Sequence, residues 1–198
     1  MSKGRLEAFS DGVIAILITI MVLELKVPHG TDLRALSALV PVISSYVLSF
    51  VFLGIYWNNH HHLFQAVKRV DGRVLWANLH LLFWLSLVPF VTAWLGENPR
   101  APVPVAIYGA VLLCSGCAYF LLARVLVALH GRESTLAVAI GEDRKGIASV
   151  VLYAAAVGFA FVRPPVSLVL YVAVAVMWLV PDRRIERILA STGEPSRE

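Results

Sequence analysis

The feature that most constrains this chain is a series of six apolar segments, separated by residues that form turns or carry charge. About 20 mostly apolar residues cross the ~30 Å hydrocarbon core of a bilayer. Segments of this kind satisfy their backbone polar groups inside lipid by forming helices. We therefore expect an all-α membrane protein with six transmembrane helices per subunit. The expected spans are roughly Phe9–Leu25, Leu36–Trp57, Val74–Leu95, Val103–Leu129, Ile147–Val162 and Val166–Val180.

Composition supports the membrane class and excludes others. The chain has 198 residues, of which 59% are hydrophobic and 15% charged, whereas soluble domains are about 45–50% apolar and about 25% charged. The net charge of +4 comes from basic residues scattered in short loops, so no nucleic-acid partner is expected. The pattern predicts one transmembrane domain over residues 1–187 and a short polar, disordered tail over residues 188–198. No cleavable signal peptide is expected, because Asp11 precedes the first apolar run and no small-x-small site follows it.

The distribution of lysine and arginine predicts the orientation of the chain. With the N-terminus inside, only four of the 17 basic residues fall on the outer side, and the other 13 fall on the inner side. Both termini are therefore expected in the cytoplasm. The fifth and sixth spans are separated only by Arg163-Pro164-Pro165, which predicts a tight helical hairpin, with a re-entrant fifth segment as the alternative. The four outer residues are Lys26, Arg34, Arg100 and Arg163.

The first span is predicted to have two different faces. At 100° per residue, Ser10 and Asp11 point about 120° and 140° away from its main apolar stripe. A carboxylate at the centre of a membrane helix costs roughly 2.5–3.5 kcal/mol, so the polar pair is expected to meet neighbouring helices. Composition alone would place the apolar stripe against lipid. The stripe consists of Ile16, Ile20 and Leu23, with Thr19 beside them and Phe9 at its start.

Polar residues in the second and third spans lie at the same expected depth as this pair. The second span ends in Trp57-x-x-His60, and the third carries Asn78 near its inner end. Taken alone, Arg5 is typical of a positive anchor at the inner membrane surface. Together these residues predict a polar layer between helices, made by Arg5, Ser10, Asp11, Trp57, His60 and Asn78.

Two patterns that resemble reactive sites are better explained by packing. In His60-His61-His62, consecutive helix positions diverge by 100°, so at most two imidazoles from one helix can reach one ion, and hydrogen bonding is favoured over metal binding. The pair Cys114 and Cys117 lies inside an apolar run without a nearby charge or a second cysteine pair. No His-Glu-x-x-His pattern and no Ser/His/Asp set at one depth is present. We expect no enzyme activity, no metal and no cofactor.

Three motifs in the first half of the chain point to a family. They are Arg5-x-x-x-Phe9-Ser10-Asp11 at the start of the first span, Trp57-x-x-His60 with Leu63-Phe64 at the end of the second, and Asn78-Leu79 with Pro89 in the third. In these motifs the chain resembles the lysosomal-type potassium channels, the transmembrane protein 175 family. The first motif is the specific one, and beyond the third span the likeness is one of hydropathy and length. A single six-span unit is similar to the prokaryotic members, which assemble as homotetramers.

The resemblance implies a potassium-permeable cation channel in the plasma membrane of a prokaryote. Such channels lack the Thr-Val-Gly-Tyr-Gly filter of ordinary potassium channels, and this sequence lacks it too. The resemblance implies that the first helix of each subunit lines a central pore and that the Arg-Phe-Ser-Asp motif ties this helix to its neighbours. By the same resemblance, the principal constriction falls at Ile16, with Ile20 and Leu23 as further layers and Thr19 beside them.

Two alternatives stay open from the sequence. Glu24 lies on the outer turn, within about 80° of the stripe. It either forms a ring of carboxylates at the pore mouth, or pairs with Lys26 or extends to the lipid headgroups. The chain is alternatively a proton-coupled secondary transporter in which Asp11 and His60 titrate.

Overall fold

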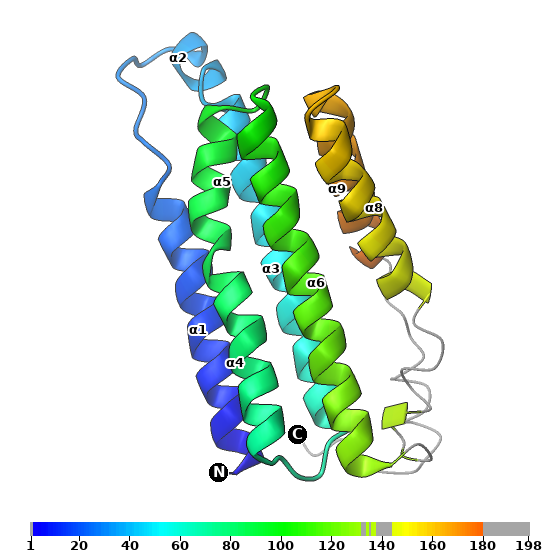
Figure 1. The fold of residues 1–198 in the computed structure, drawn as a ribbon. Coiled ribbons are helices and arrows are strands. Elements are labelled where there is room, and N and C mark those ends of the chain that lie inside the picture. Colours follow the sequence, from blue (N-terminus) through cyan, green and yellow to red (C-terminus); the bar gives the residue numbers. More distant parts are fainter. Residues whose placement is uncertain (1, 132–133, 135, 138–143, 180–198) are drawn as a thin grey trace.

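The structure, a computed structural model, describes residues 2–131, 134, 136, 137 and 144–179, and all regular secondary structure in this part of the chain is helical. Figure 1 shows an elongated bundle with α1 at one edge and α8 and α9 at the other. The expected tail, residues 188–198, lies outside the described residues. The helices are α1 (Lys3–Leu23), α2 (Leu33–Ser37), α3 (Val40–Gln65), α4 (Gly72–Ser86), α5 (Val88–Glu97), α6 (Pro102–His130), α8 (Arg144–Ala160) and α9 (Pro164–Leu179).

Four helical stretches are long and apolar enough to cross a membrane: α1, α3, α4 together with α5, and α6. They coincide with the first four predicted spans. The fifth and sixth predicted spans correspond to α8 and α9, which are apolar but have only 17 and 16 residues. At 1.5 Å per residue these two helices are about 25 Å long, close to the thickness of a bilayer core.

Two of the predicted spans differ from the helices in a way that matters for the site. The second predicted span stops at Trp57, whereas α3 continues to Gln65 and holds the three histidines in helical register. The third span is broken at Leu87, the residue that ends α4 and precedes α5. Pro89 lies in the first turn of α5, and its missing N–H interrupts the helical hydrogen-bond ladder there.

The helix α1 buries one stripe and leaves the opposite side bare. It packs against α3, α4 and α5, and none of the helices that the structure describes covers its other side (Figure 1). The buried residues recur every three to four positions, as one helical face requires. They are Leu6, Ser10, Ile14, Leu17 and Met21.

Two contacts hold α6 against its surroundings. A Cβ atom at Gly109 would collide with the hydroxyl of Tyr171 on α9, which itself donates a hydrogen bond to the carbonyl of Val105 at 2.9 Å. At the other end of α6, His130 Nε2 accepts hydrogen bonds from the backbone N–H groups of Lys68 and Arg69, at 3.3 and 3.4 Å. The segment that joins α3 to α4 is thereby fixed to the end of α6.

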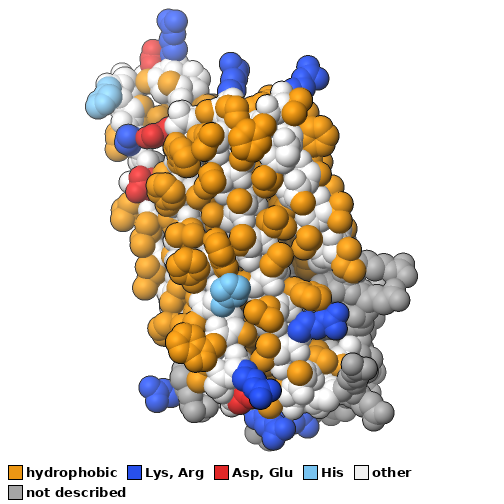
Figure 2. Space-filling view, viewed as in Figure 1, with side chains coloured by type: hydrophobic (Ala, Val, Ile, Leu, Met, Phe, Trp, Pro, Cys, Tyr) orange, Lys and Arg blue, Asp and Glu red, His pale blue; other side chains and the backbone are white. Residues whose placement is uncertain are grey.

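Charged side chains gather toward the two ends of the molecule, and apolar side chains cover most of the length between them (Figure 2). This distribution is typical of a protein whose sides face hydrocarbon and whose ends face water.

Candidate functional site

A chain of buried hydrogen bonds joins α1, α3 and α4. Asn78 Nδ2 donates to Ser10 Oγ at 2.9 Å, and Asn78 Oδ1 lies 2.8 Å from His60 Nε2. Because the amide oxygen accepts, Nε2 of the imidazole carries the proton in this arrangement. The Ser10 hydroxyl in turn donates to the carbonyl of Leu6 at 2.9 Å. The side chains of Ser10, His60 and Asn78 are at most 1% exposed. The three helices therefore meet at a polar contact that is closed to water.

A second contact between α1 and α3 lies at the surface beside the first. Trp57 Nε1 donates to a carboxylate oxygen of Asp11 at 3.0 Å. The indole also stacks on the ring of His61, with the ring centroids 6.1 Å apart. Asp11 is exposed and Trp57 is 45% exposed. The carboxylate therefore has a specific donor at the edge of the α1–α3 contact.

The three adjacent histidines point to different surroundings. His60 is buried against Phe64, with ring centroids 4.6 Å apart. His61 is exposed and His62 is half-buried, and both lie within hydrogen-bond distance of Gln65. Among the residues that the structure describes, no group of three or more histidine, cysteine, aspartate or glutamate side chains is arranged to hold a metal ion.

The apolar stripe of α1 lies on the uncovered side of the helix. Ile16, Ile20 and Leu23 are 57%, 41% and 80% exposed in the single subunit. Phe9 is exposed at the start of the stripe. Thr19 is exposed as well, and its hydroxyl donates to the carbonyl of Ile16 at 2.8 Å. Ser10 and Ile16 thus lie on opposite sides of α1, one buried and one bare.

The charged residues at the two ends of α1 are exposed. The Arg5 side chain makes no hydrogen bond or ion pair with any described residue, so the structure does not bring it into the polar cluster. Glu24 follows the last residue of α1 and is also exposed. Lys26 Nζ binds Glu97 Oε1 at 3.2 Å. The alternative in which Lys26 pairs with Glu24 is therefore wrong, because Glu97 at the end of α5 is the partner.

A second buried polar cluster was not predicted from the sequence. Thr92 on α5 donates to Ser49 on α3 at 2.7 Å, and Ser49 lies 2.9 Å from the hydroxyl of Tyr108 on α6. Lone hydroxyl groups within apolar spans are the only signal for it, and that signal does not say which helices pair. His80, two residues after Asn78, lies on the exposed side of α4 and accepts a hydrogen bond from Trp84 at 3.0 Å.

Comparison with known proteins decides the family. A family model described as "Endosomal/lysosomal potassium channel TMEM175" matches residues 5–89. A Chryseobacterium sp. (strain P1-3) protein named as a potassium channel is 51% identical over 189 residues, which cover 96% of this chain and 98% of that protein. This chain belongs to the TMEM175 family. The resemblance inferred from the Arg-Phe-Ser-Asp motif is therefore confirmed.

The fold of this TMEM175-family chain is also that of a solved relative. It matches the crystal structure of a lysosomal potassium-selective channel TMEM175 homolog from Chamaesiphon minutus with a TM-score of 0.77 and 29% identity, over 90% of this chain and 96% of that chain. A Danio rerio protein named as an endosomal/lysosomal proton channel, TMEM175, is 28% identical over 135 residues, which cover 66% of this chain but 25% of that protein. These TMEM175 relatives are named as channels, which is compatible with a chain that is not an enzyme.

Proposed function

We propose that the chain is a potassium-permeable channel of a prokaryotic plasma membrane, formed by four copies around a central axis. The observation that carries the proposal is the two-sided character of α1. Its buried stripe contacts α3, α4 and α5, while Ile16, Ile20 and Leu23 face away from the subunit. A helix at the edge of the bundle with such a bare face is suited to line a pore shared by several copies.

In this proposal an apolar constriction of the pore controls which ions pass. Four Ile16 side chains form the narrowest ring, with Ile20 and Leu23 as further layers and the Thr19 hydroxyl beside them. An apolar ring controls permeation either by excluding water or by close fit around the ion. The four Glu24 carboxylates at the mouth concentrate cations by their combined negative potential.

The polar contacts set which side of α1 faces the pore. Rotation of α1 would break the buried bond of Ser10 to Asn78 and the bond of Asp11 to Trp57. Inside a bilayer each such bond is worth about 0.6 kcal/mol on average and up to about 2 kcal/mol. We assign the Arg-Phe-Ser-Asp motif this orienting role, with Arg5 as the anchor at the cytoplasmic surface and Phe9 at the entrance of the pore.

The proposed topology has six spans and both termini in the cytoplasm. The start of α1, the end of α3 and the start of α4 lie close to five basic residues, which favours placing that end inside. They are Lys3, Arg5, Lys68, Arg69 and Arg73. The short helices α8 and α9 cross with little tilt, since their length leaves no excess over the hydrocarbon thickness.

The transporter alternative has less support. Its titrating pair would be Asp11 and His60, but these bind Trp57 and Asn78 respectively rather than each other. A relative that matches 96% of this chain is named as a potassium channel. An ohmic potassium current, rather than saturable uptake driven by a proton gradient, is therefore proposed.

The test is the reversal potential of purified protein in planar bilayers under a potassium–sodium gradient. We expect a potassium-permeable current whose unitary conductance or selectivity changes in Ile16→Ala. The matched control is Val22→Ala, because Val22 is also exposed on α1 but lies about 120° around the helix from Ile16. If the currents of Ile16→Ala and Val22→Ala both equal that of wild type, Ile16 does not form the constriction of the pore. A monomeric particle by light scattering in detergent would argue against the shared pore.

A further inference from the structure

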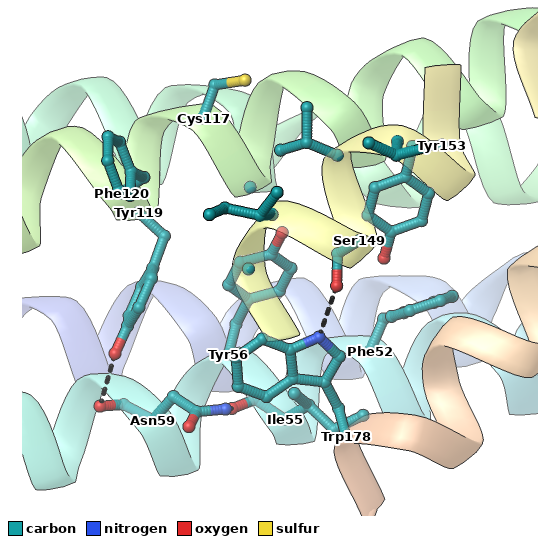
Figure 3. Close-up of a pocket in the computed structure, with 15 residues that line it drawn as sticks. Phe52, Ile55, Tyr56, Asn59, Cys117, Tyr119, Phe120, Ser149, Tyr153 and Trp178 are labelled. Atoms are coloured by element: carbon teal, nitrogen blue, oxygen red, sulfur yellow. Dashed lines mark hydrogen bonds between the residues drawn. The ribbon is translucent and has the colours of Figure 1, made fainter. Parts of the chain in front are cut away.

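A cavity of about 350 Å³ lies away from the pore helix, among α3, α6, α8 and α9. Its walls are largely aromatic and include Phe52, Tyr56, Phe120, Tyr153 and Trp178 (Figure 3). The volume falls within the range of about 300–1,000 Å³ that is usual for small-molecule sites.

The cavity opens to the side of the bundle. Three of its lining residues, Phe120, Ile147 and Val151, are 41%, 65% and 61% exposed. They belong to apolar helices of a membrane protein, so the opening faces hydrocarbon and not bulk water. A molecule dissolved in the bilayer can enter from there, while water gains little in a cavity that is almost entirely apolar.

Most polar groups in the walls are already occupied. Trp178 Nε1 donates to Ser149 Oγ at 2.8 Å, and the Tyr119 hydroxyl donates to the carbonyl of Asn59 at 3.1 Å; Figure 3 shows both bonds. These paired groups are not available to a ligand.

The hydroxyl of Tyr153 is different. Tyr153 is 3% exposed, lines the cavity, and forms no hydrogen bond with any residue that the structure describes. In Figure 3 its hydroxyl points inward beside Ser149. Because no buried side-chain nitrogen or oxygen of the described residues lacks a hydrogen-bond partner, this hydroxyl is accessible from the cavity and open to an occupant there. An occupant that offers one acceptor is favoured over one that is purely hydrocarbon, because it can accept this hydrogen bond.

We infer that this cavity binds a small, ring-bearing apolar molecule from the bilayer that accepts one hydrogen bond from Tyr153. The aromatic walls favour flat rings over a saturated chain, because aromatic pairs gain energy beyond the burial of their area. The single free donor sets the polarity of the ligand to one carbonyl or ether oxygen. The site is independent of what the pore conducts.

Benzophenone is a suitable probe, because it has two rings, one carbonyl oxygen, and attaches to nearby C–H bonds under ultraviolet light. The full-length protein in lipid nanodiscs is illuminated with benzophenone, and the adducts are located by peptide mass spectrometry. We expect adducts on cavity-lining peptides of α3, α6 and α8. Tyr153→Phe keeps the ring and removes the donor, so labelling there should fall about fivefold at subsaturating probe. Tyr46→Phe, on α3 outside the cavity, should leave labelling unchanged.

A second pair of variants changes the volume of the cavity and leaves the Tyr153 hydroxyl in place. Gly116 lines the cavity, and a Cβ atom there would meet the Tyr56 hydroxyl at an ordinary contact of 3.7 Å. Gly116→Leu therefore fills the cavity and should abolish labelling. Gly158→Leu is the control, since an added Cβ atom at Gly158 meets nothing within 4 Å and Gly158 does not line the cavity. If Gly116→Leu fails to fold, Cys117→Phe fills the same space from α6.

Two results would overturn the inference. Adducts spread evenly over the lipid-facing helices would show that the cavity has no preference for the probe. Labelling in the cavity that is equal in wild type and Tyr153→Phe would remove the hydrogen bond and indicate that the cavity holds an acyl chain instead.

Discussion

The indole nitrogen of Trp57 lies 3.0 Å from a carboxylate oxygen of Asp11, and this bond joins α3 to α1 within one turn of the buried contact between Ser10 and Asn78. The two bonds join successive positions of α1, Ser10 and Asp11, to neighbouring helices, while the apolar stripe of α1 is exposed on another side. We predict that these polar residues, together with the packed face of α1, set the orientation of that stripe.

The Trp57–Asp11 bond can be tested by replacing the donor. Trp57→Phe keeps an aromatic ring against His61 but cannot donate, so we expect a loss of about 1 kcal/mol in unfolding free energy. Asp11→Asn retains an acceptor and should lose less than Asp11→Ala. The measurement is thermal unfolding in detergent, combined as a double-mutant cycle. Additive losses from Trp57→Phe and Asp11→Ala would mean that the two side chains do not interact.

Asn78 is expected to be the most sensitive member of the buried cluster. Asn78→Ala removes the acceptor of His60 and leaves a buried imidazole N–H without a partner, which costs about 1–3 kcal/mol. Ser10→Ala removes the acceptor for the Asn78 amide and the donor to the Leu6 carbonyl but leaves the His60–Asn78 bond in place, so it should cost less. Chemical denaturation of the two variants checks the order. A larger loss in Ser10→Ala would show that Asn78 is not the centre of the cluster.

Glu24 is predicted to act through its charge. Glu24→Gln should lower the single-channel conductance at low potassium concentration, and the difference from wild type should vanish at high salt, where the Debye length is about 3 Å. Glu97→Gln removes a carboxylate at the same end of the bundle that is already bound to Lys26, and it should have a smaller effect. Conductance measured over a range of potassium concentrations checks both. A Glu24→Gln effect that persists at high salt would contradict an electrostatic role.

His130 is predicted to protect the segment between α3 and α4. His130→Phe removes the acceptor of the Lys68 and Arg69 backbone N–H groups, so hydrogen exchange at those amides should become faster. The control is His62→Phe, because the half-buried His62 contacts Gln65 and not Lys68 or Arg69. Unchanged exchange at Lys68 and Arg69 in His130→Phe would show that the contact does not hold the segment.

Gly109 is predicted to tolerate no side chain while Tyr171 keeps its hydroxyl. Gly109→Ala places a methyl group against that hydroxyl and should destabilise the fold by about 1–3 kcal/mol. Adding Tyr171→Phe removes the clashing atom, so the double variant should recover part of the loss. Thermal unfolding of the single and double variants decides this. No recovery in the double variant would place the strain elsewhere.

The sequence predicted the first four spans and the separation of Ser10 from Ile16 well, because both follow from hydropathy and the 100° step of a helix. The fifth and sixth segments correspond to shorter apolar helices, and their crossing of the membrane stays a prediction. It predicted helix ends poorly: histidines are too polar for a hydropathy-based span, yet α3 runs through all three of them. The pairing of Ser49 with Tyr108 and Thr92 was out of reach, since it depends on which helices become neighbours. The mistaken Lys26 partner has the same cause, because Glu97 is 71 residues away in the chain.

The break at Leu87 divides the third span mechanically. Asn78 belongs to α4 and Thr92 to α5, so the two buried polar clusters lie on different sides of a joint. The members of the two clusters on α3, His60 and Ser49, belong to one unbroken helix, so α3 connects the two halves of the third span across the break. A movement of α4 relative to α5 therefore has to displace one of the clusters against α3, and the polar contacts oppose bending at Leu87.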